Sequence, residues 1–177
     1  MKVYDDFLSP KDFHYVQSNM LGCQFPWTQG VVMDPDQYNQ YPLVDEQLCD
    51  EIDNIQFSNW IYRDFEPKGP QFALVQPIIY DPRLEICSIN RIKANLTLRT
   101  PEVVKHGYHR DGIGNFMVAI YYVNSNDGYT EFEDGTQVKS IENRLLVFDS
   151  SLRHTGTTCT NEKVRCVINF NYFPEDL

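Results

Sequence analysis

The sequence predicts an α+β fold in which β-strands predominate and the helices lie near the N-terminus. The aromatic share is high at 14%, with eleven Tyr and eleven Phe, and aromatic side chains pack well on pleated sheets. From Leu84 onward, short β-rich runs alternate with turn residues, as in antiparallel sandwiches and barrels. We therefore expect a double-stranded β-helix, or jelly roll, with the N-terminal helices packed on one sheet.

The expected helices lie in the first half of the chain. Ser9 is a candidate N-cap, because Pro10 follows at the first helical position and Asp12 places an acid in the first turn. This helix should run to about Gly22. The other elements expected here are a polar loop over Asp34–Pro42, a short helix over Asp45–Ile55 and a further helix over Phe72–Tyr80.

The second half of the chain carries the predicted strands. Turn residues at 124–128 (NSNDG) and at 133–135 (EDG) separate apolar runs. The expected strands are Leu84–Leu98, Phe116–Val123, Tyr129–Glu133, Arg144–Phe148 and Val164–Phe173.

Length and charge limit the possible functions. A chain of 177 residues without repeats or linker-like tracts is expected to form one domain, residues 1–177. The net charge of −10 and the pI of about 4.7 disfavour nucleic acid and anionic membranes as partners. No stretch approaches the roughly 20 apolar residues of a membrane span, and no secretion signal is visible, so a cytoplasmic location is expected.

The cysteines indicate neither a disulfide framework nor a zinc cluster. Their number is odd, their spacing is irregular and no CxxC pair occurs. We expect reduced thiols at Cys23, Cys49, Cys87, Cys159 and Cys166.

The triplet His109-Arg110-Asp111 is a candidate half of a metal site. In an extended segment, residues two apart project from the same face, so both His109 and Asp111 can reach one ion. Two histidines and one carboxylate on one face of an octahedral Fe(II) leave the opposite positions open for a cosubstrate and dioxygen. A second histidine must then come from a distant strand.

His154 is the best candidate for that second histidine. It follows the apolar strand at 145–148 across a short polar loop. Of the other histidines, His14 lies in the predicted N-terminal helix and is expected at the surface, whereas His106 is too near His109 to be assigned from spacing and is treated as a loop or supporting residue.

A cation in the last strand suggests an anionic cosubstrate. Arg165 opens the run at 164–170 (VRCVINF), where a buried guanidinium needs a partner. Its paired donors match a carboxylate, so Arg165 could bind the distal carboxylate of 2-oxoglutarate. Lys163 has the same strand parity and remains a rival, although it lies in the turn that precedes the strand.

Together these residues resemble the 2-oxoglutarate-dependent Fe(II) dioxygenases, and among them the prolyl 4-hydroxylase-like branch. The resemblance begins at 4–9 (YDDFLS) and covers nearly the whole chain. It rests chiefly on the segments 109–111 (HRD), 119–124 (AIYYVN), 128–132 (GYTEF), 144–148 (RLLVF) leading to His154, and 165–173 (RCVINFNYF).

The resemblance implies roles for further residues. Hypoxia-sensing members use the second Tyr of the pair for the distal carboxylate, which carries over to Tyr122, while Tyr121 should point the other way. Thr130, Asn95 and Asn169 are expected to line the cosubstrate pocket.

Two positions depart from the family pattern. Collagen-type members place Lys where Arg165 stands, and the hypoxia sensors have an aromatic residue where Asn171 stands. The second change leaves the substrate open. Related halogenases replace the metal-binding carboxylate with a small residue, and this chain keeps Asp111, so hydroxylation is expected.

The resemblance implies an enzyme that uses Fe(II) and 2-oxoglutarate, with ascorbate as a further candidate cofactor. The expected reaction hydroxylates an unactivated C–H bond, most simply in a prolyl residue of a peptide or protein, with release of succinate and CO₂. The polar segments Arg99–Tyr108 and Asp34–Pro42 would form flexible lips over an open site, and the acidic surface would favour neutral or basic peptide segments. Alternatives are a small-molecule substrate, nucleic acid, and a non-catalytic metal-binding jelly-roll module. The oligomeric state is left open.

Overall fold

The computed structural model describes residues 1–32, 55–112 and 114–175, and its main feature is one large antiparallel sheet. The strands of this sheet lie in the order β1-β9-β6-β11-β5-β3-β2, and β4 pairs with β3. Their bounds are β1 Lys2–Tyr4, β2 Thr28–Val31, β3 Ile55–Arg63, β4 Glu66–Pro67, β5 Ile86–Leu98, β6 Met117–Tyr122, β9 Arg144–Asp149 and β11 Val164–Pro174.

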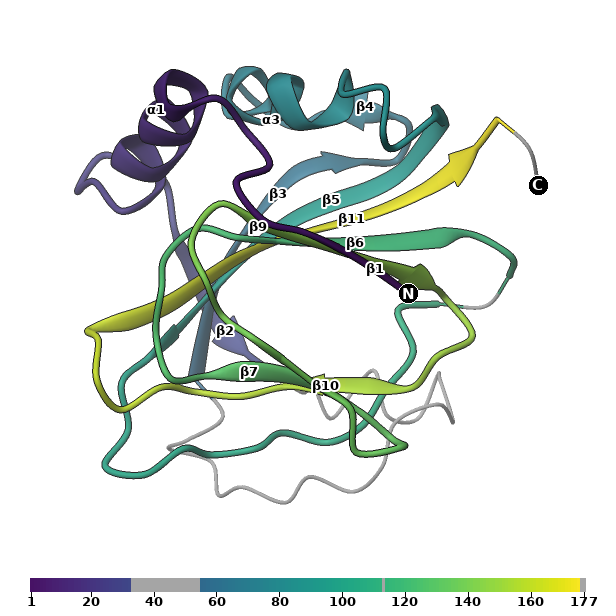
Figure 1. The fold of residues 1–177 in the computed structure, drawn as a ribbon. Helices are drawn as coiled ribbons and strands as arrows, with labels where there is room; N and C mark the ends of the chain where they lie inside the picture. The colour runs from purple at the N-terminus through teal and green to yellow at the C-terminus, as the bar shows by residue number, and fades with distance from the viewer. Residues whose placement is uncertain (33–54, 113, 176–177) are drawn as a thin grey trace.

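A second, smaller antiparallel sheet lies across from the first (Figure 1). Its order is β10-β7-β8, with β10 at His154–Gly156, β7 at Tyr129–Phe132 and β8 at Gln137–Lys139. Side chains from both sheets form one apolar cluster that includes Phe132, Val138, Ile120 and Phe148. The two sheets thus face each other across a shared core, and the predicted mainly β jelly roll is confirmed.

The two faces of the large sheet carry different cores. In β6, Tyr121 belongs to the cluster under the helices, whereas Tyr122 belongs to the cluster between the sheets. This alternation follows from the two-residue period of a strand. The predicted opposite directions of the two tyrosines are confirmed, and the even-numbered residues 166–172 of β11 lie on the helix side in the same way.

The helices α1 (Pro10–Met20) and α3 (Phe72–Ile79) cover one face of the large sheet (Figure 1). The Ser9 hydroxyl accepts a hydrogen bond from the Asp12 amide at 3.2 Å, so the predicted cap forms. Both helices end within two residues of their predicted limits. The predictions for Asp34–Pro42 and Asp45–Ile55 lie outside the described residues, except that Ile55 begins β3.

The predicted order of helices first and strands second is wrong. The strand β1 precedes α1, and β2, β3 and β4 lie between α1 and α3. The strand β3 was not predicted. Its residues 55–60 are all half-buried, so they do not alternate between a buried and an exposed face as the residues of an easily recognised strand do. The five predicted strands of the second half match β5, β6, β7, β9 and β11 to within two residues at each end, whereas the three-residue strands β8 and β10 were not predicted.

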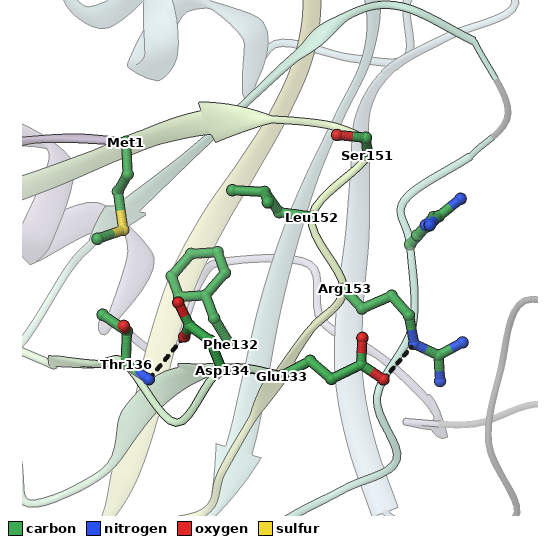
Figure 2. Close-up of a pocket in the computed structure, with 9 residues that line it drawn as sticks. Met1, Phe132, Glu133, Asp134, Thr136, Ser151, Leu152 and Arg153 are labelled. Atoms are coloured by element: carbon green, nitrogen blue, oxygen red, sulfur yellow. Dashed lines mark hydrogen bonds and ion pairs between the residues drawn. The ribbon is translucent and has the colours of Figure 1, made fainter.

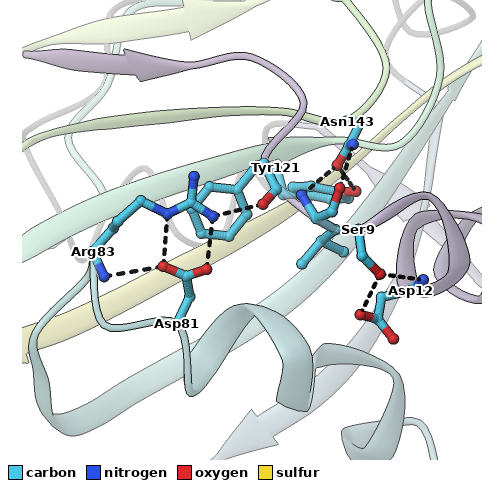
Figure 3. Close-up of polar contacts among 8 residues, drawn as sticks. Ser9, Asp12, Asp81, Arg83, Tyr121 and Asn143 are labelled. Carbon is cyan, nitrogen blue, oxygen red and sulfur yellow. Dashed lines mark hydrogen bonds and ion pairs between the residues drawn. The ribbon is translucent and has the colours of Figure 1, made fainter.

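Long-range polar contacts attach the N-terminal segment to the sheet (Figure 3). The Asn143 side chain accepts from the Leu8 amide at 2.9 Å, donates to the Leu8 carbonyl at 3.0 Å and accepts from the Tyr121 hydroxyl at 2.9 Å. Asn143 adopts a positive φ of 57°, a conformation that Asn tolerates better than most residues. Nearby, Arg83 donates to both Asp81 carboxylate oxygens and to the Phe7 carbonyl.

Two further findings bear on the composition. The described cysteines Cys23, Cys87, Cys159 and Cys166 are free thiols, as predicted, and Cys49 lies outside the described residues. Among the described residues, no helix is long and apolar enough to cross a membrane.

Candidate metal centre and cosubstrate pocket

Three side chains from two distant segments of the chain meet, namely His109 and Asp111 from the segment between β5 and β6 and His154 from β10. One ligand atom from each of His109, Asp111 and His154 lies within 4.8 Å of the other two. The backbones of His109 and His154 exchange two hydrogen bonds, of 2.9 and 3.0 Å, which place the imidazole rings side by side. The predicted pair of segments therefore does come together.

Backbone carbonyls orient both imidazoles. The Nδ1 atom of His109 lies 3.3 Å from the Gly107 carbonyl, and that of His154 lies 3.2 Å from the Leu152 carbonyl. A ring whose Nδ1 donates to a carbonyl carries its free lone pair on Nε2. Both Nε2 atoms lie 3.9 Å from an oxygen of Asp111, so the three free ligand atoms converge.

The two carboxylate oxygens of the buried Asp111 differ in their hydrogen bonding. Its side chain is only 3% exposed, and Oδ1 accepts from Arg91 at 2.7 Å. Burial acts to raise the pKa of Asp111, but Arg91 and the two histidines outweigh it and hold that pKa below its usual range. The buried Oδ2 has no hydrogen-bond partner in the part of the chain that the structure describes. A divalent cation would supply that partner, so the donor set fits a metal ion.

His154 is held in its neutral form. Burial, with a smaller effect of His109, lowers the pKa of His154 to about 4. A histidine must be deprotonated to bind a metal. The burial of His154 therefore keeps it ready to act as a ligand at neutral pH.

Arg165 is buried between the sheets, and its described partners are hydroxyl groups. Its Nε donates to the Ser140 hydroxyl at 2.9 Å and its Nη2 to the Thr130 hydroxyl at 3.3 Å. No carboxylate among the residues that the structure describes forms an ion pair with it, and burial lowers the pKa of its guanidinium. A buried cation with hydroxyl partners alone suits an anionic ligand.

Of the other predicted pocket residues, Tyr122, Asn95 and Asn169 share the inner face of the large sheet with Arg165, whereas Thr130 lies on β7 of the small sheet. The Tyr122 ring centroid lies 5.8 Å from the Arg165 guanidinium carbon, and its hydroxyl donates to Thr130 at 2.8 Å. Asn95 faces inward because it pairs with Val167, a member of the inner core, and Asn169 lies two residues further along β11. The Oδ1 atoms of both asparagines are buried without a donor in the described structure.

His14, His106 and Lys163, the other candidates from the sequence, lie outside the metal-ligand group. His14 is exposed on α1, as predicted. His106 is buried, and its backbone forms hydrogen bonds with Gly156 and Thr155. Lys163 is exposed just before β11, so of these two cations it is Arg165 that faces the inner core.

Sequence reasoning missed two basic residues on the inner face, Arg91 and Lys93. Arg91 binds Asp111 directly, and Lys93 follows it on the same face of β5. Their position two residues apart in a predicted strand was the available signal. This spacing alone could not place the two residues beside the metal ligands. That placement depends on the pairing of β5 with β11 and on the contact of Arg91 with Asp111, which are long-range features.

An open pocket with a volume of about 490 Å³ is lined by Phe132, Leu152 and Arg153 among others (Figure 2). Arg110 and Arg153, the neighbours of the three ligands in sequence, line it together with Phe132 and Leu152. Arg153 forms an ion pair with Glu133 at 3.3 Å. The ligands themselves do not line this pocket, so it adjoins the centre and does not contain it.

The segment from Arg99 to Tyr108 was predicted to be a flexible lip, but in the structure it is held by hydrogen bonds. It runs along residues 156–159 and is held by backbone hydrogen bonds, among them Thr100 to Cys159 at 3.0 Å and His106 to Gly156 at 3.2 Å. Side chains add to this, because Lys105 and Tyr108 both bind the Glu131 carboxylate. The lip prediction for Asp34–Pro42 lies outside the described residues.

Comparison with known proteins supports the fold. No protein-family model and no curated protein matches the chain. A prolyl hydroxylase from Trichoplax adhaerens, in complex with a peptide of hypoxia inducible factor, superposes with a TM-score of 0.54 at 16% identity, covering 98% of this chain and 83% of its own.

Two further solved structures agree with it. An oxidoreductase of the 2OG-Fe(II) oxygenase family from Burkholderia pseudomallei gives a TM-score of 0.52 at 13% identity, with 92% and 90% of the two chains covered. HygX from Streptomyces hygroscopicus, with nickel, 2-oxoglutarate and hygromycin B bound, gives 0.53 at 11% identity, with 99% and 83% covered. The chain therefore has the jelly-roll fold of the prolyl hydroxylases and other 2-oxoglutarate-dependent Fe(II) oxygenases.

Proposed function

We propose that this protein is a non-haem Fe(II)- and 2-oxoglutarate-dependent dioxygenase and that its active site lies in a single domain of residues 1–177. The observation that carries the proposal is the convergence of His109, Asp111 and His154, in which the buried Asp111 Oδ2 has no hydrogen-bond partner among the described residues. Two imidazoles and one carboxylate on one side of an Fe(II) ion leave its other positions open.

The roles of the side chains follow from their surroundings. The carbonyls of Gly107 and Leu152 fix the two imidazoles, and Arg91 fixes the carboxylate. Arg165 binds the distal carboxylate of 2-oxoglutarate, with Tyr122, Thr130, Asn95 and Asn169 as further pocket residues. With iron and cosubstrate bound, the centre couples oxidative decarboxylation of 2-oxoglutarate to hydroxylation of a substrate C–H bond, and succinate and CO₂ are released.

For the substrate we propose a prolyl residue of a peptide or protein, hydroxylated at ring carbon 4. The similar prolyl hydroxylase from Trichoplax adhaerens holds a peptide fragment, which supports this class. A small molecule is the second candidate, because the similarly folded HygX holds hygromycin B. We further propose that ascorbate sustains turnover and that the enzyme works in the cytoplasm.

The test is a turnover assay with the purified full chain, Fe(II), ascorbate and 2-oxoglutarate. Succinate is quantified, and proline-containing peptides and free proline are examined by mass spectrometry for an added oxygen. His109→Ala, Asp111→Ala and His154→Ala should each abolish succinate formation and Mn(II) binding. His14→Ala is the matched control, because His14 is exposed on α1.

The outcomes separate the alternatives. Oxygen added to free proline but to no peptide would establish the small-molecule substrate. Metal binding without succinate formation under any condition would indicate a non-catalytic module. Full iron-dependent activity in His154→Ala would show that the metal site is wrongly assigned.

A further inference from the structure

A tryptophan beside the candidate centre lies between two cations. Trp60 of β3 is half-buried, and its ring centroid lies 5.1 Å from the Lys93 Nζ and 4.7 Å from the Arg63 guanidinium carbon. Trp60 and Lys93 are directly paired across β3 and β5. This group of three residues, which we call the Trp60 cluster, has no place in the machinery described above.

The Trp60 cluster lies next to the metal ligands. In β5, Ile92 and Ala94 belong to the core under the helices, so Arg91 and Lys93 project to the opposite, inner face. Arg91 contacts Asp111 at 2.7 Å, and Lys93 is the next inward residue on the same strand. Lys93 therefore faces the space in which a substrate of the candidate centre would lie.

Lys93 lacks a counter-ion in the described structure. Arg91 is committed to Asp111, and Arg63 has a weak, exposed contact with Asp64 at 3.7 Å, whereas Lys93 has no hydrogen bond or ion pair with any described residue. Burial, reinforced by Arg91 and opposed by Asp111, lowers the pKa of Lys93 to about 8. A half-buried ammonium without an acceptor among the described residues is costly unless a ligand supplies one.

The cosubstrate does not need Lys93. The proposed function gives 2-oxoglutarate two anchors for its two carboxylates, namely Arg165 for the distal group and the metal for the 2-oxo acid end. Along β11, Arg165 pairs with Thr97, whereas Asn169 pairs with Lys93. The Trp60 cluster extends from Lys93 to β3, away from β11. It is therefore available to bind the substrate that is oxidised.

On this basis, and assuming the proposed function, we infer that the Trp60 cluster binds a carboxylate of the substrate, so that the enzyme selects acidic substrates. The Lys93 ammonium donates to the carboxylate oxygens, Arg63 adds positive charge at the rim, and the Trp60 ring packs against the adjoining carbon atoms. This reverses the expectation from net charge, because the −10 of the whole chain does not describe the cationic wall beside the metal site.

The carboxylate could belong to an acidic residue near the oxidised position of a peptide or to a free amino acid. Two ligand pairs distinguish these sources. One is a proline-containing peptide with Glu beside the proline and the same peptide with Gln, and the other is L-proline and L-prolinamide. Each pair differs chiefly in the carboxylate.

The binding assay uses the fluorescence of Trp60 and does not depend on turnover. The chain has two tryptophans, Trp27 and Trp60, so Trp27→Phe leaves Trp60 as the only reporter. This protein is loaded with Mn(II) and 2-oxoglutarate and titrated with each ligand. We expect the acidic member of one pair to bind roughly tenfold more tightly than its neutral partner, the scale of one charged hydrogen bond.

Three variants in the Trp27→Phe background locate the effect. Lys93→Met should reduce the preference for the acidic ligand to about one and leave 2-oxoglutarate affinity unchanged. Arg63→Gln, at an exposed position that tolerates change, should reduce the preference in part and keeps the test valid if Lys93→Met fails to fold. Lys11→Met removes the same charge from the exposed start of α1 and should change nothing.

The outcomes decide the inference separately from the proposed function. A preference within the peptide pair, or within the proline pair, supports the carboxylate site and names its source. Equal binding within both pairs would overturn it, as would a Lys93→Met variant that loses 2-oxoglutarate affinity and keeps the preference. A carboxylate preference in a protein that never forms succinate would instead refute the proposed function alone.

Discussion

Arg165→Met should weaken 2-oxoglutarate binding without destabilising the fold. The guanidinium has five N–H donors, and two of them bind the hydroxyls of Ser140 and Thr130. Five minus two leaves three donors without a partner among the described residues, enough for two parallel hydrogen bonds to a carboxylate. Methionine keeps the volume of the aliphatic stem and removes all five.

The magnitude follows from these free donors. Hydrogen bonds to charged groups contribute about 1.5–3 kcal/mol each, so loss of even one net interaction weakens binding roughly 10- to 100-fold. A buried charge that lacks an ionic partner costs stability in the absence of ligand. The melting temperature of the ligand-free variant should therefore equal or exceed that of the original protein.

Calorimetric titration of the Mn(II)-loaded protein with 2-oxoglutarate, together with thermal unfolding, measures both quantities. Lys163→Met is the matched control, because Lys163 is an exposed cation two residues away. The reasoning is refuted if Arg165→Met binds 2-oxoglutarate normally and melts more than about 5 °C lower, the shift that 1–2 kcal/mol produces at this size. That result would make Arg165 a structural residue. If Lys163→Met lost affinity instead, Lys163 would be the carboxylate ligand.

Three further predictions concern the fold and the pocket. Asn143→Ala removes three side-chain hydrogen bonds and leaves a positive φ at a residue that tolerates it poorly. The free energy of unfolding measured in urea should therefore fall by about 3–4 kcal/mol. An unchanged free energy of unfolding would show that the N-terminal contacts are dispensable. Gly128→Ala would place a Cβ 2.6 Å from a backbone oxygen and 2.7 Å from the Arg165 side chain, so 2-oxoglutarate affinity should fall while Gly30→Ala, with its nearest atom at 3.7 Å, retains it. The pKa values of His106 and His154 are lowered to about 4, below about 6.5 in an unfolded chain. Acidification from pH 6.5 to 4 therefore adds protons to the unfolded chain first, and the melting temperature of the metal-free protein should fall over that range; a constant melting temperature there would contradict the assigned burial.

Local rules were sufficient for the parts of the site that depend on strand parity. His109 and Asp111 lie two residues apart and meet on one face, and the opposite directions of Tyr121 and Tyr122 follow from the same period. Lys163 and Arg165 have the same strand parity, so this rule left them as rivals; the structure places Lys163 at the surface and Arg165 in the interior. The directions of His109 and Asp111, and of Tyr121 and Tyr122, thus depend on only a few consecutive residues.

Features that require distant pairing could not be predicted in this way. Trp60 and Lys93 meet because β3 pairs with β5, and Arg91 reaches Asp111 across a separation of 20 residues. The strand β10 is only three residues long and forms because its backbone pairs with β7. No local pattern in these segments encodes the partner.

The pairing of β1 with β9 has a consequence for the order in which the molecule assembles. Lys2 pairs with Val147, and Asp5 binds Arg144 across 139 positions of the chain. Because synthesis proceeds from the N-terminus, the first strand must wait for most of the polypeptide to emerge before its neighbour exists. Contacts of such long sequence separation slow folding. Closure of this sheet edge is thus a late event on the ribosome, and a nascent chain stalled before residue 144 would leave β1 without its partner strand.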